Sequence, residues 1–484
     1  MIEKYIEKEI MRQVKIVEYI YECRELPISD ISYNLDVSYN TIKRDVDKII
    51  LALNNFISYS QITSTHISII FYDKYTRYDL IKEIYKASNF LSVCSRYLLG
   101  DRDYINIVEE EFVSVTKAFR LKKSVELYFR EIDVFDENNE WIMDELKLRL
   151  VMITVWMRCP HLYHEIDQVN METIEIFTNQ VLNDLSNHYE ANNREYAFLV
   201  WSVYLSISRH KSFPIQDTSP KISDLKNSLA FHKIKKYGNK FFNKKNLDDN
   251  EFLFITSVYK NISLNSNNYT LIQMNYQAER KNVIESNIYI RNLALMFEQE
   301  FEHNLFYNIL FERPLISFSY SLWNDLQNFI VYRHYYLNKY QLSLVKRIKK
   351  ILVTWKNQVY PDNSFMYNDA AIEHFTYQLA SVLAFNKETK HTFFIVAENE
   401  ESHTVYREII THWINMETNI IDSTLYYSLD DVPPYISKHP SIIICERSLL
   451  FKEKQKIPHV FPISRYSIRE DLKKILSELL NLIQ

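Results

Sequence analysis

Hydrophobic residues near the start of the chain recur at helical spacing in two short segments separated by a turn. The first segment places three apolar residues on one helical face: Ile28, Ile31 and Leu35. The second segment repeats this with Ile42, Val46, Ile49 and Ile50. Asp36 and Val37 form the predicted turn, and Ser38 suits an N-cap because its hydroxyl can accept a backbone N–H of the next helix. We therefore expect two helices joined by a tight turn over residues 28–51.

The segment that follows is rich in β-branched and aromatic residues and has a polar break in its middle. Residues 56–72 read FISYSQITSTHISIIFY, and the break at 63–65 predicts a β-hairpin. Two helices followed by a hairpin are typical of a winged helix, whose second helix enters the major groove of DNA. Its outer face carries side chains suited to base edges and phosphates: Asn40, Lys43, Arg44 and Asp47. The candidate DNA-binding residues of this unit are Ser38, Tyr39, Asn40, Thr41, Lys43 and Arg44. The alternative is an ordinary amphipathic hairpin of a helical protein.

A degenerate second copy of this pattern begins about one small domain later. Residues 113–120 can be laid over 37–44, with Ser114 at the cap position and Lys122 where the first copy has the inward Val46. The inward residues of its second helix are Ala118, Leu121 and Val125. Upstream, a turn one residue shorter is expected to leave three further residues facing inward: Ile105, Val108 and Phe112. The candidate DNA-binding residues of this copy are Ser114, Thr116, Lys117, Arg120 and Lys123.

The two predicted recognition helices differ in charge. Residues 117–124 hold four basic residues and no acidic one, whereas the first helix mixes three basic residues with Asp45 and Asp47. Phosphate contacts position a protein on DNA and base contacts specify the sequence. We therefore assign more of the electrostatic attraction to the second helix and more of the base reading to the first. The presumed second hairpin, over 132–141, is acidic and unsuited to phosphates. The alternative for this copy is a packing domain with a solvated basic face.

The middle of the chain has helical periodicity. Residues 78–99 are predicted to connect the two candidate units, and 140–157 to close the second. Two sets of helices follow on either side of a polar break, Asn265–Asn268, at 165–190, 193–210, 222–243 and 248–264, and then at 275–300, 315–333, 336–357 and 367–387. Loops within the sets are marked by Pro214, Pro220 and Pro361. Two all-helical bundles are the simplest interpretation.

The last part of the chain alternates between strand and helix patterns. Short apolar runs at 392–397, 419–425, 441–445 and 460–463 predict buried strands. An amphipathic helix is expected over 402–416, with Ser402 as its cap, and a final helix over 469–483. Strands that alternate with helices favour a small open parallel α/β sheet.

Composition limits the classes of function. The chain has 484 residues, a net charge of −5 and a pI of about 6.3, so any DNA contact must come from local basic patches. Four scattered cysteines form neither a metal-binding pattern nor a disulfide framework, which favours a reducing cytoplasm. The charged N-terminus is not a signal peptide, and no apolar stretch predicts a membrane span.

Glycine is almost absent, and this excludes several enzyme classes. Only Gly100 and Gly238 occur, so the phosphate-binding loops of nucleotide enzymes are missing. No HExxH or GxSxG motif is present, and no nucleophile–base pair can be named. We therefore expect no enzymatic activity and no cofactor.

The order of these predicted units resembles the Mga family of transcriptional regulators, which includes AtxA-like virulence regulators of Gram-positive bacteria. The resemblance covers essentially the whole chain and is best at 37–46, 113–123, 207–209 with Pro214 and Ile215, and 393–406. It implies a mainly α, multidomain protein with two winged helix-turn-helix domains (1–75 and 76–160), two bundles similar to phosphotransferase-system regulation domains (161–272 and 273–390), and a C-terminal α/β domain similar to enzyme IIB (391–484).

The resemblance also implies promoter binding, activation of transcription and homodimerisation through the C-terminal domain, with RNA polymerase and phosphotransfer proteins as further partners. The chain departs from the family where a phosphorylated histidine is expected: it reads Glu195-Tyr196-Ala197-Phe198 in the first bundle and Val382-Leu383-Ala384-Phe385 in the second. His374 and His210 are the remaining candidates, whereas His188 and His334 lie elsewhere. The first turn of the last domain is acidic, Glu398-Asn399-Glu400-Glu401, and would repel phosphate. We interpret this domain as a former phosphate carrier reused for dimerisation.

The leading hypothesis is a cytoplasmic transcriptional regulator, most simply an activator, that binds double-stranded promoter DNA as a dimer. The alternatives are a phosphorylation-responsive signalling protein and a helical scaffold for protein–protein interactions.

Overall fold

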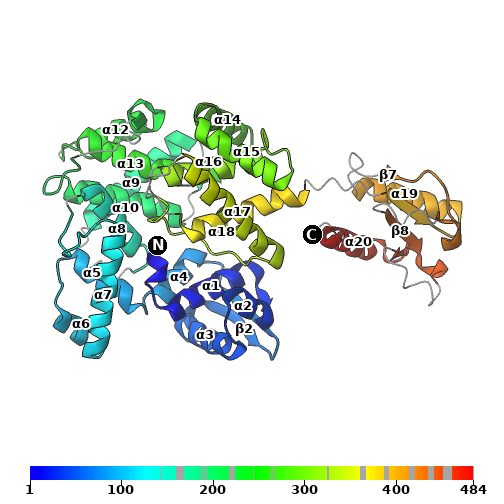
Figure 1. Cartoon of the computed structure of the whole chain (residues 1–484), viewed down its shortest axis with the longest axis horizontal. Coiled ribbons are helices and arrows are strands. Elements are labelled where there is room, and N and C mark those ends of the chain that lie inside the picture. The colour runs from blue at the N-terminus through cyan, green and yellow to red at the C-terminus, as the bar shows by residue number, and fades with distance from the viewer. Residues whose placement is uncertain are drawn as a thin grey trace. The chain divides into compact units, whose positions relative to one another are not determined.

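The computed structural model describes most of the chain, with short gaps. The described residues are 1–142, 144–159, 168–186, 189–190, 193–216, 224–243, 245–262, 265–266, 269–323, 326–359, 367–385, 392–413, 420–433, 441–450 and 460–482. The structure is mainly helical and has a small α/β region at its C-terminal end. It divides into two compact units, Met1–Leu379 and Ala380–Gln484 (Figure 1). His188, Pro220 and Pro361 lie outside the described residues.

The first part of the N-terminal unit combines three helices with a small antiparallel sheet. Helix α1 (Lys8–Cys23) leads to β1 (Glu25–Pro27), then α2 (Ile28–Leu35) and α3 (Tyr39–Ala52), and then the hairpin of β2 (Ile57–Ile62) and β3 (His66–Phe71). The strand order is β1-β3-β2. The predicted helix pair, turn and hairpin are therefore confirmed, and Ile28, Ile31, Ile42, Val46 and Ile49 are buried as expected.

The next part consists of five helices. They are α4 (Arg77–Tyr85), α5 (Asn89–Leu98), α6 (Tyr104–Glu110), α7 (Val115–Glu131) and α8 (Glu145–Trp156). The helical pattern at 78–99 forms two helices, α4 and α5, and Ser88 caps the second by accepting the N–H of Leu91. The presumed hairpin between α7 and α8 is reduced to a single bridge between Phe135 and Trp141.

The first expected set of helices follows. It comprises α9 (Gln168–Ser186), α10 (Asn193–Arg209), α12 (Leu229–Phe241) and α13 (Asp249–Asn261), close to the predicted bounds. Two short strands, β4 (Tyr189–Glu190) and β5 (Asn265–Ser266), pair with each other in antiparallel fashion. The polar break at 265–268 thus begins with a short strand.

The second set departs further from the prediction. The expected helix over 275–300 is split into α14 (Tyr269–Arg280), a π-helical turn (Lys281–Glu285) and α15 (Ile288–Phe301). Helix α16 (Ile309–Trp323) begins and ends earlier than expected, and residues 331–338 have no regular secondary structure, so the prediction of a helix up to 333 is wrong. Helices α17 (Lys339–Val359) and α18 (Asp369–Phe385) agree with the expected bounds.

The C-terminal unit contains the predicted parallel sheet. Strands β6 (Thr392–Val396), β7 (Ile420–Ile421), β8 (Ser441–Glu446) and β9 (Val460–Ile463) lie in the order β7-β6-β8-β9, and every neighbouring pair is parallel. Helices α19 (Glu400–Trp413) and α20 (Ile468–Leu482) complete it. Ser402 was expected to cap α19, and this prediction is wrong because Ser402 lies inside the helix. Its backbone N–H donates to Asn399 Oδ1, 2.8 Å away. Asn399 is the capping residue because it directly precedes the helix.

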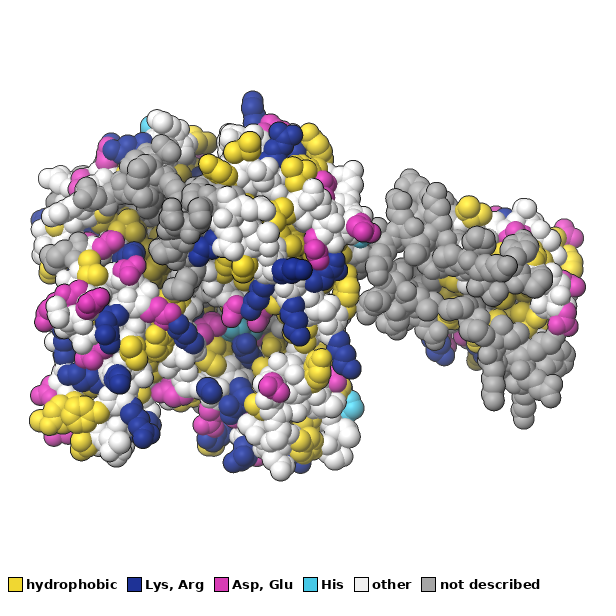
Figure 2. Space-filling view, viewed as in Figure 1, with side chains coloured by type: hydrophobic (Ala, Val, Ile, Leu, Met, Phe, Trp, Pro, Cys, Tyr) yellow, Lys and Arg dark blue, Asp and Glu magenta, His cyan; other side chains and the backbone are white. Residues whose placement is uncertain are grey.

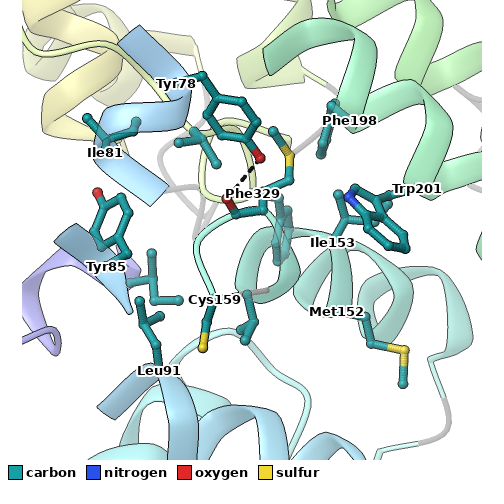
Figure 3. Close-up of a cluster of buried hydrophobic side chains, with 14 of the residues drawn as sticks. Tyr78, Ile81, Tyr85, Leu91, Met152, Ile153, Cys159, Phe198, Trp201 and Phe329 are labelled. Atoms are coloured by element: carbon teal, nitrogen blue, oxygen red, sulfur yellow. Dashed lines mark hydrogen bonds between the residues drawn. The ribbon is translucent and has the colours of Figure 1, made fainter. Parts of the chain in front are cut away.

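One continuous hydrophobic core joins the first eight helices to the first bundle. Figure 3 shows part of this core, to which α4 contributes Tyr78 and Tyr85, α8 contributes Ile153 and α10 contributes Trp201. The hydroxyl of Tyr78 donates to the carbonyl of Met157, 2.9 Å away. The helix pairs α2–α3 and α6–α7 therefore share one core with helices α9–α13.

Candidate nucleic-acid interface

Helix α3 begins at a well-formed cap. Ser38 Oγ accepts the backbone N–H of Thr41 at 3.3 Å and lies 2.9 Å from the Thr41 hydroxyl. Asp36, in the turn before it, has a φ of 51°, a left-handed conformation that aspartate adopts more readily than most residues. The side chains of Ser38 and Thr41 therefore have a structural role in starting the helix.

A buried ion pair fixes α3 against α1. Arg12 Nε donates to Asp45 Oδ2 at 2.7 Å, and Asp45 is only 1% exposed. The negative charge of Asp45 is therefore neutralised inside the protein and does not repel a phosphate. The sequence alone suggests instead that Asp45 lowers the net positive charge of this helix. Lys48 is paired with Glu9 at 2.5 Å.

The tip of the hairpin is held beside the start of α3. The hydroxyl of Tyr39 donates to the carbonyl of Ser64 in the hairpin turn, 2.5 Å away. Lys43 Nζ lies 5.1 Å from the centre of the Tyr39 ring, a cation–π distance. Tyr39 therefore positions both the hairpin and Lys43, a role that the sequence pattern does not indicate.

The outer face of α3 leaves polar side chains free. Asn40, Arg44 and Asp47 are exposed, and Lys43 is half-buried. Within the described part of the chain, neither Asn40 nor Arg44 has a side-chain hydrogen bond or ion pair. An exposed amide and guanidinium on adjacent helical turns can reach the edges of neighbouring bases.

Helix α7 begins in the same way as α3, after a serine that caps its first turn. Ser114 Oγ accepts the N–H of Lys117 at 3.3 Å, and Ala118, Leu121 and Val125 are buried as predicted. Thr116, Lys117, Arg120 and Lys123 are exposed, and Lys117 Nζ also contacts Asn89 Oδ1 at 2.9 Å. Lys122 is half-buried and donates to the carbonyl of Arg102 at 3.3 Å, which explains how a lysine is accommodated at this inward position.

The inward face of α6 differs from the prediction. Ile107 is buried, whereas Ile105 is 47% and Phe112 94% exposed. Phe112 occupies the left-handed turn position, with a φ of 50°, that Asp36 occupies in the first copy. The turn before α7 is therefore not one residue shorter than the turn before α3, as had been expected. The prediction that Ile105 and Phe112 face inward is wrong, whereas Val108 is half-buried.

Exposed apolar side chains therefore stand beside the basic ones at the start of α7. They are Ile105, Phe112, Val115 and Phe119. Phe119 stacks on Tyr104, with ring centres 4.7 Å apart. Figure 2 shows hydrophobic and basic side chains next to one another over α6 and the start of α7, at the lower left. Apolar groups of this kind can pack on thymine methyl groups in the major groove.

Both helices belong to the same compact unit. Figure 1 shows α3 and α6, with the start of α7, toward the same edge of this unit, away from α12 and α14.

The candidate phosphorylation sites are poorly placed to accept a phosphoryl group. His210 Nδ1 lies 3.0 Å from the carbonyl of Ile207 and Nε2 lies 2.7 Å from that of Lys245, so both ring nitrogens are engaged. His374 Nδ1 lies 3.1 Å from the Tyr335 hydroxyl, and burial together with the nearby Arg194 and Arg333 lowers the pKa of His374 to about 4. His334 is 1% exposed.

The acidic turn after β6 is closed by a carboxylate of the same chain. Glu446 Oε2 accepts the backbone N–H of Glu398 at 2.8 Å, and Glu446 Oε1 accepts the Tyr406 hydroxyl at 2.9 Å. A carboxylate thus occupies backbone and hydroxyl donors that could otherwise face a bound anion.

We expect Glu446→Ala to lower the free energy of unfolding of the C-terminal unit by about 1–3 kcal/mol, because it leaves the Glu398 N–H and the hydroxyl of the buried Tyr406 without their acceptor. Thermal unfolding followed by hydrogen exchange in this unit measures the loss. Glu401→Ala, which removes an exposed carboxylate from the same turn, is the matched control. Equal stability of the two variants would contradict this role of Glu446.

The comparisons with known proteins add no assignment. No family model matches the chain, and no curated protein matches it. Among the residues that the structure describes, no cluster of His, Cys, Asp and Glu side chains could hold a metal ion. In those same residues, no helix has the length and apolar character needed to cross a membrane.

Proposed function

We propose that the protein is a DNA-binding regulator of transcription that contacts duplex DNA through α3 and α7. One observation carries this proposal: the outer faces of two serine-capped helices expose Asn40 and Arg44 in one copy and Thr116, Arg120 and Lys123 in the other. The order α1, β1, α2, α3, β2, β3 is that of a winged helix, which supports placing α3 in the major groove.

The two helices differ in what they offer to DNA. Helix α7 exposes three basic side chains on one face, which favours contacts to the phosphates. Helix α3 exposes an amide and a guanidinium, which suit adenine and guanine edges. We therefore propose that α3 selects the sequence and that α7 supplies more of the affinity.

We further propose that the protein acts as a homodimer, with the C-terminal unit as the contact. Large apolar side chains are exposed at the end of α19 and in or shortly after the edge strand β7, and this supports the proposal: Trp413, Ile420, Leu425 and Tyr427. A two-fold symmetric dimer would place its recognition helices on an inverted repeat.

Selection from a random duplex library tests both parts of the proposal. The full chain is expected to enrich one recurring sequence, arranged as an inverted repeat. Enrichment of a single, non-repeated motif would support sequence-specific DNA binding but would contradict the proposed dimer. Failure to enrich any sequence, with retention of duplex no greater than for bovine albumin, would contradict DNA binding altogether.

A further inference from the structure

A cavity lies between the two helical bundles, far along the chain from α3 and α7. Its volume is about 270 Å³. Helices α10, α13, α16 and α18 contribute its walls, together with the irregular segment 330–335. This volume is close to the lower end of the range for small-molecule sites, roughly 300–1,000 Å³, and suits a compact metabolite.

The polar groups of this cavity carry an excess of positive charge. Arg194, Arg333 and His374 line it, and among the described lining residues Glu195 is the only acidic one. Arg194 Nη2 lies 2.8 Å from Glu195 Oε1, which balances one arginine. Arg333 forms no ion pair or hydrogen bond with its side chain within the described ranges. Among the described residues, the guanidinium of Arg333 therefore has no counter-charge in the cavity.

The remaining lining residues suit the body of a small organic ligand. Ser317, Ser321 and Gln378 offer polar atoms, and Phe198, Phe318 and Val331 form an apolar wall. The imidazole of His374 is neutral, because burial and the two arginines lower its pKa to about 4. It can therefore donate one further hydrogen bond to an oxyanion without adding charge.

We propose that this cavity binds a small metabolite bearing a carboxylate or phosphate group, with Arg333 as the main counter-charge and Arg194 and His374 beside it. A guanidinium pairs with the oxygens of either group through its planar donors, and this shared chemistry defines the ligand class.

The wall that carries Arg333 also contacts the first helix-turn-helix segment. The N–H of His334 donates to Glu18 Oε2 of α1 at 2.7 Å, and the hydroxyl of Tyr336 donates to Asp30 Oδ2 of α2 at 3.2 Å. Neighbouring residues of one short segment thus face the cavity and the α1–α2 pair.

A second contact runs through α18. Tyr335 lines the cavity and stacks on Tyr377, with ring centres 4.1 Å apart. The hydroxyl of Tyr377 donates to Glu22 Oε1 of α1 at 2.8 Å. A ligand that orders Arg333 and Tyr335 therefore also stabilises the contacts of the α1–α2 pair, which gives the cavity a route for acting on DNA binding. Only that last link depends on the proposed function.

Calorimetric titration of the full chain tests the site. The probes are inorganic phosphate, citrate and 3-phosphoglycerate at millimolar concentration, and glycerol is the uncharged control. At least one anion is expected to bind with a stoichiometry of one per chain, and Arg333→Gln to weaken it about tenfold or more. Arg291→Gln, which removes an exposed arginine of α15, is the matched control and should leave binding unchanged.

Absence of binding for all three anions, or equal binding by wild type and Arg333→Gln, would overturn the site. Preference between phosphate-bearing and carboxylate probes distinguishes the two ligand sources. Hydrogen exchange in α1 and α2 is expected to slow when the anion binds, and unchanged exchange there would overturn the coupling. Neither readout involves DNA, so a failure here is distinct from a failure of the proposed function.

Discussion

Replacement of Lys117, Arg120 and Lys123 together by alanine is expected to weaken duplex DNA binding about a hundredfold at physiological salt. These side chains are exposed on one face of α7. If each one neutralises a phosphate, the slope of log affinity against log salt should also become shallower by roughly three. Fluorescence anisotropy with a labelled duplex over a salt series measures both quantities.

The matched control changes the net charge of the chain equally but at a distant site. Arg291, Lys346 and Lys350 are exposed on α15 and α17, so their triple alanine variant tests the effect of overall charge. We expect this control to bind nearly as well as wild type. Equal losses for the two triple variants would show that α7 has no special role.

A third variant separates affinity from sequence reading. Arg44→Ala on α3 should weaken binding to the selected sequence more than binding to unrelated duplex, whereas the α7 triple variant should weaken both alike. The same anisotropy series with both duplexes makes the comparison. If Arg44→Ala weakened both duplexes equally, α3 would contact phosphates only.

The largest expected loss of stability follows from Arg149→Met. Arg149 and Glu251 are both 0% exposed, and the guanidinium of Arg149 binds both carboxylate oxygens of Glu251. It also donates to Glu145 Oε1 at 2.8 Å and to the carbonyl of Phe213 at 2.9 Å. Removing the cation leaves a buried carboxylate uncompensated, so we expect a loss of about 3–5 kcal/mol in the free energy of unfolding of the N-terminal unit.

Chemical denaturation followed by tryptophan fluorescence measures this loss. The double variant Arg149→Met with Glu251→Leu removes both charges and should recover much of the stability, because the cost of the single variant lies in the unpaired carboxylate. A loss below about 1 kcal/mol in the single variant would contradict the burial of the pair. A double variant less stable than the single one would show that the pair itself, and not its imbalance, stabilises the contact of α8 with α13.

Local signals in the sequence predicted where α3 and α7 begin. Ser38 and Ser114 could be identified from the sequence because a cap acts on a backbone N–H only three residues away. Helix α6 was predicted with the wrong face inward. A helix of seven residues makes about two turns, so Ile105 and Ile107 fit its periodicity almost equally well, and packing against α7 decides between them.

Contacts between distant parts of the chain gave no local signal. The sequence alone places Asp45 on the predicted DNA-binding helix, but it does not indicate the ion pair that Asp45 forms with Arg12 of α1. Arg333 lies in a segment whose apolar residues suggested a helix. In the structure the hydroxyl of Thr154 donates to the carbonyl of Phe329, 2.8 Å away, and Phe329 and Val331 are buried in the shared core. Tertiary packing therefore outweighs helical periodicity there, and it also creates the cavity between the bundles.

The proposed contact of α3 and α7 with duplex DNA is tested most directly by the salt dependence of the wild-type chain's affinity. Log affinity for the selected duplex should fall linearly with log salt, with a slope of roughly −3 or steeper if the three cations of α7 contact phosphates. An affinity that does not change with salt, or no binding to duplex at low salt, would contradict the account.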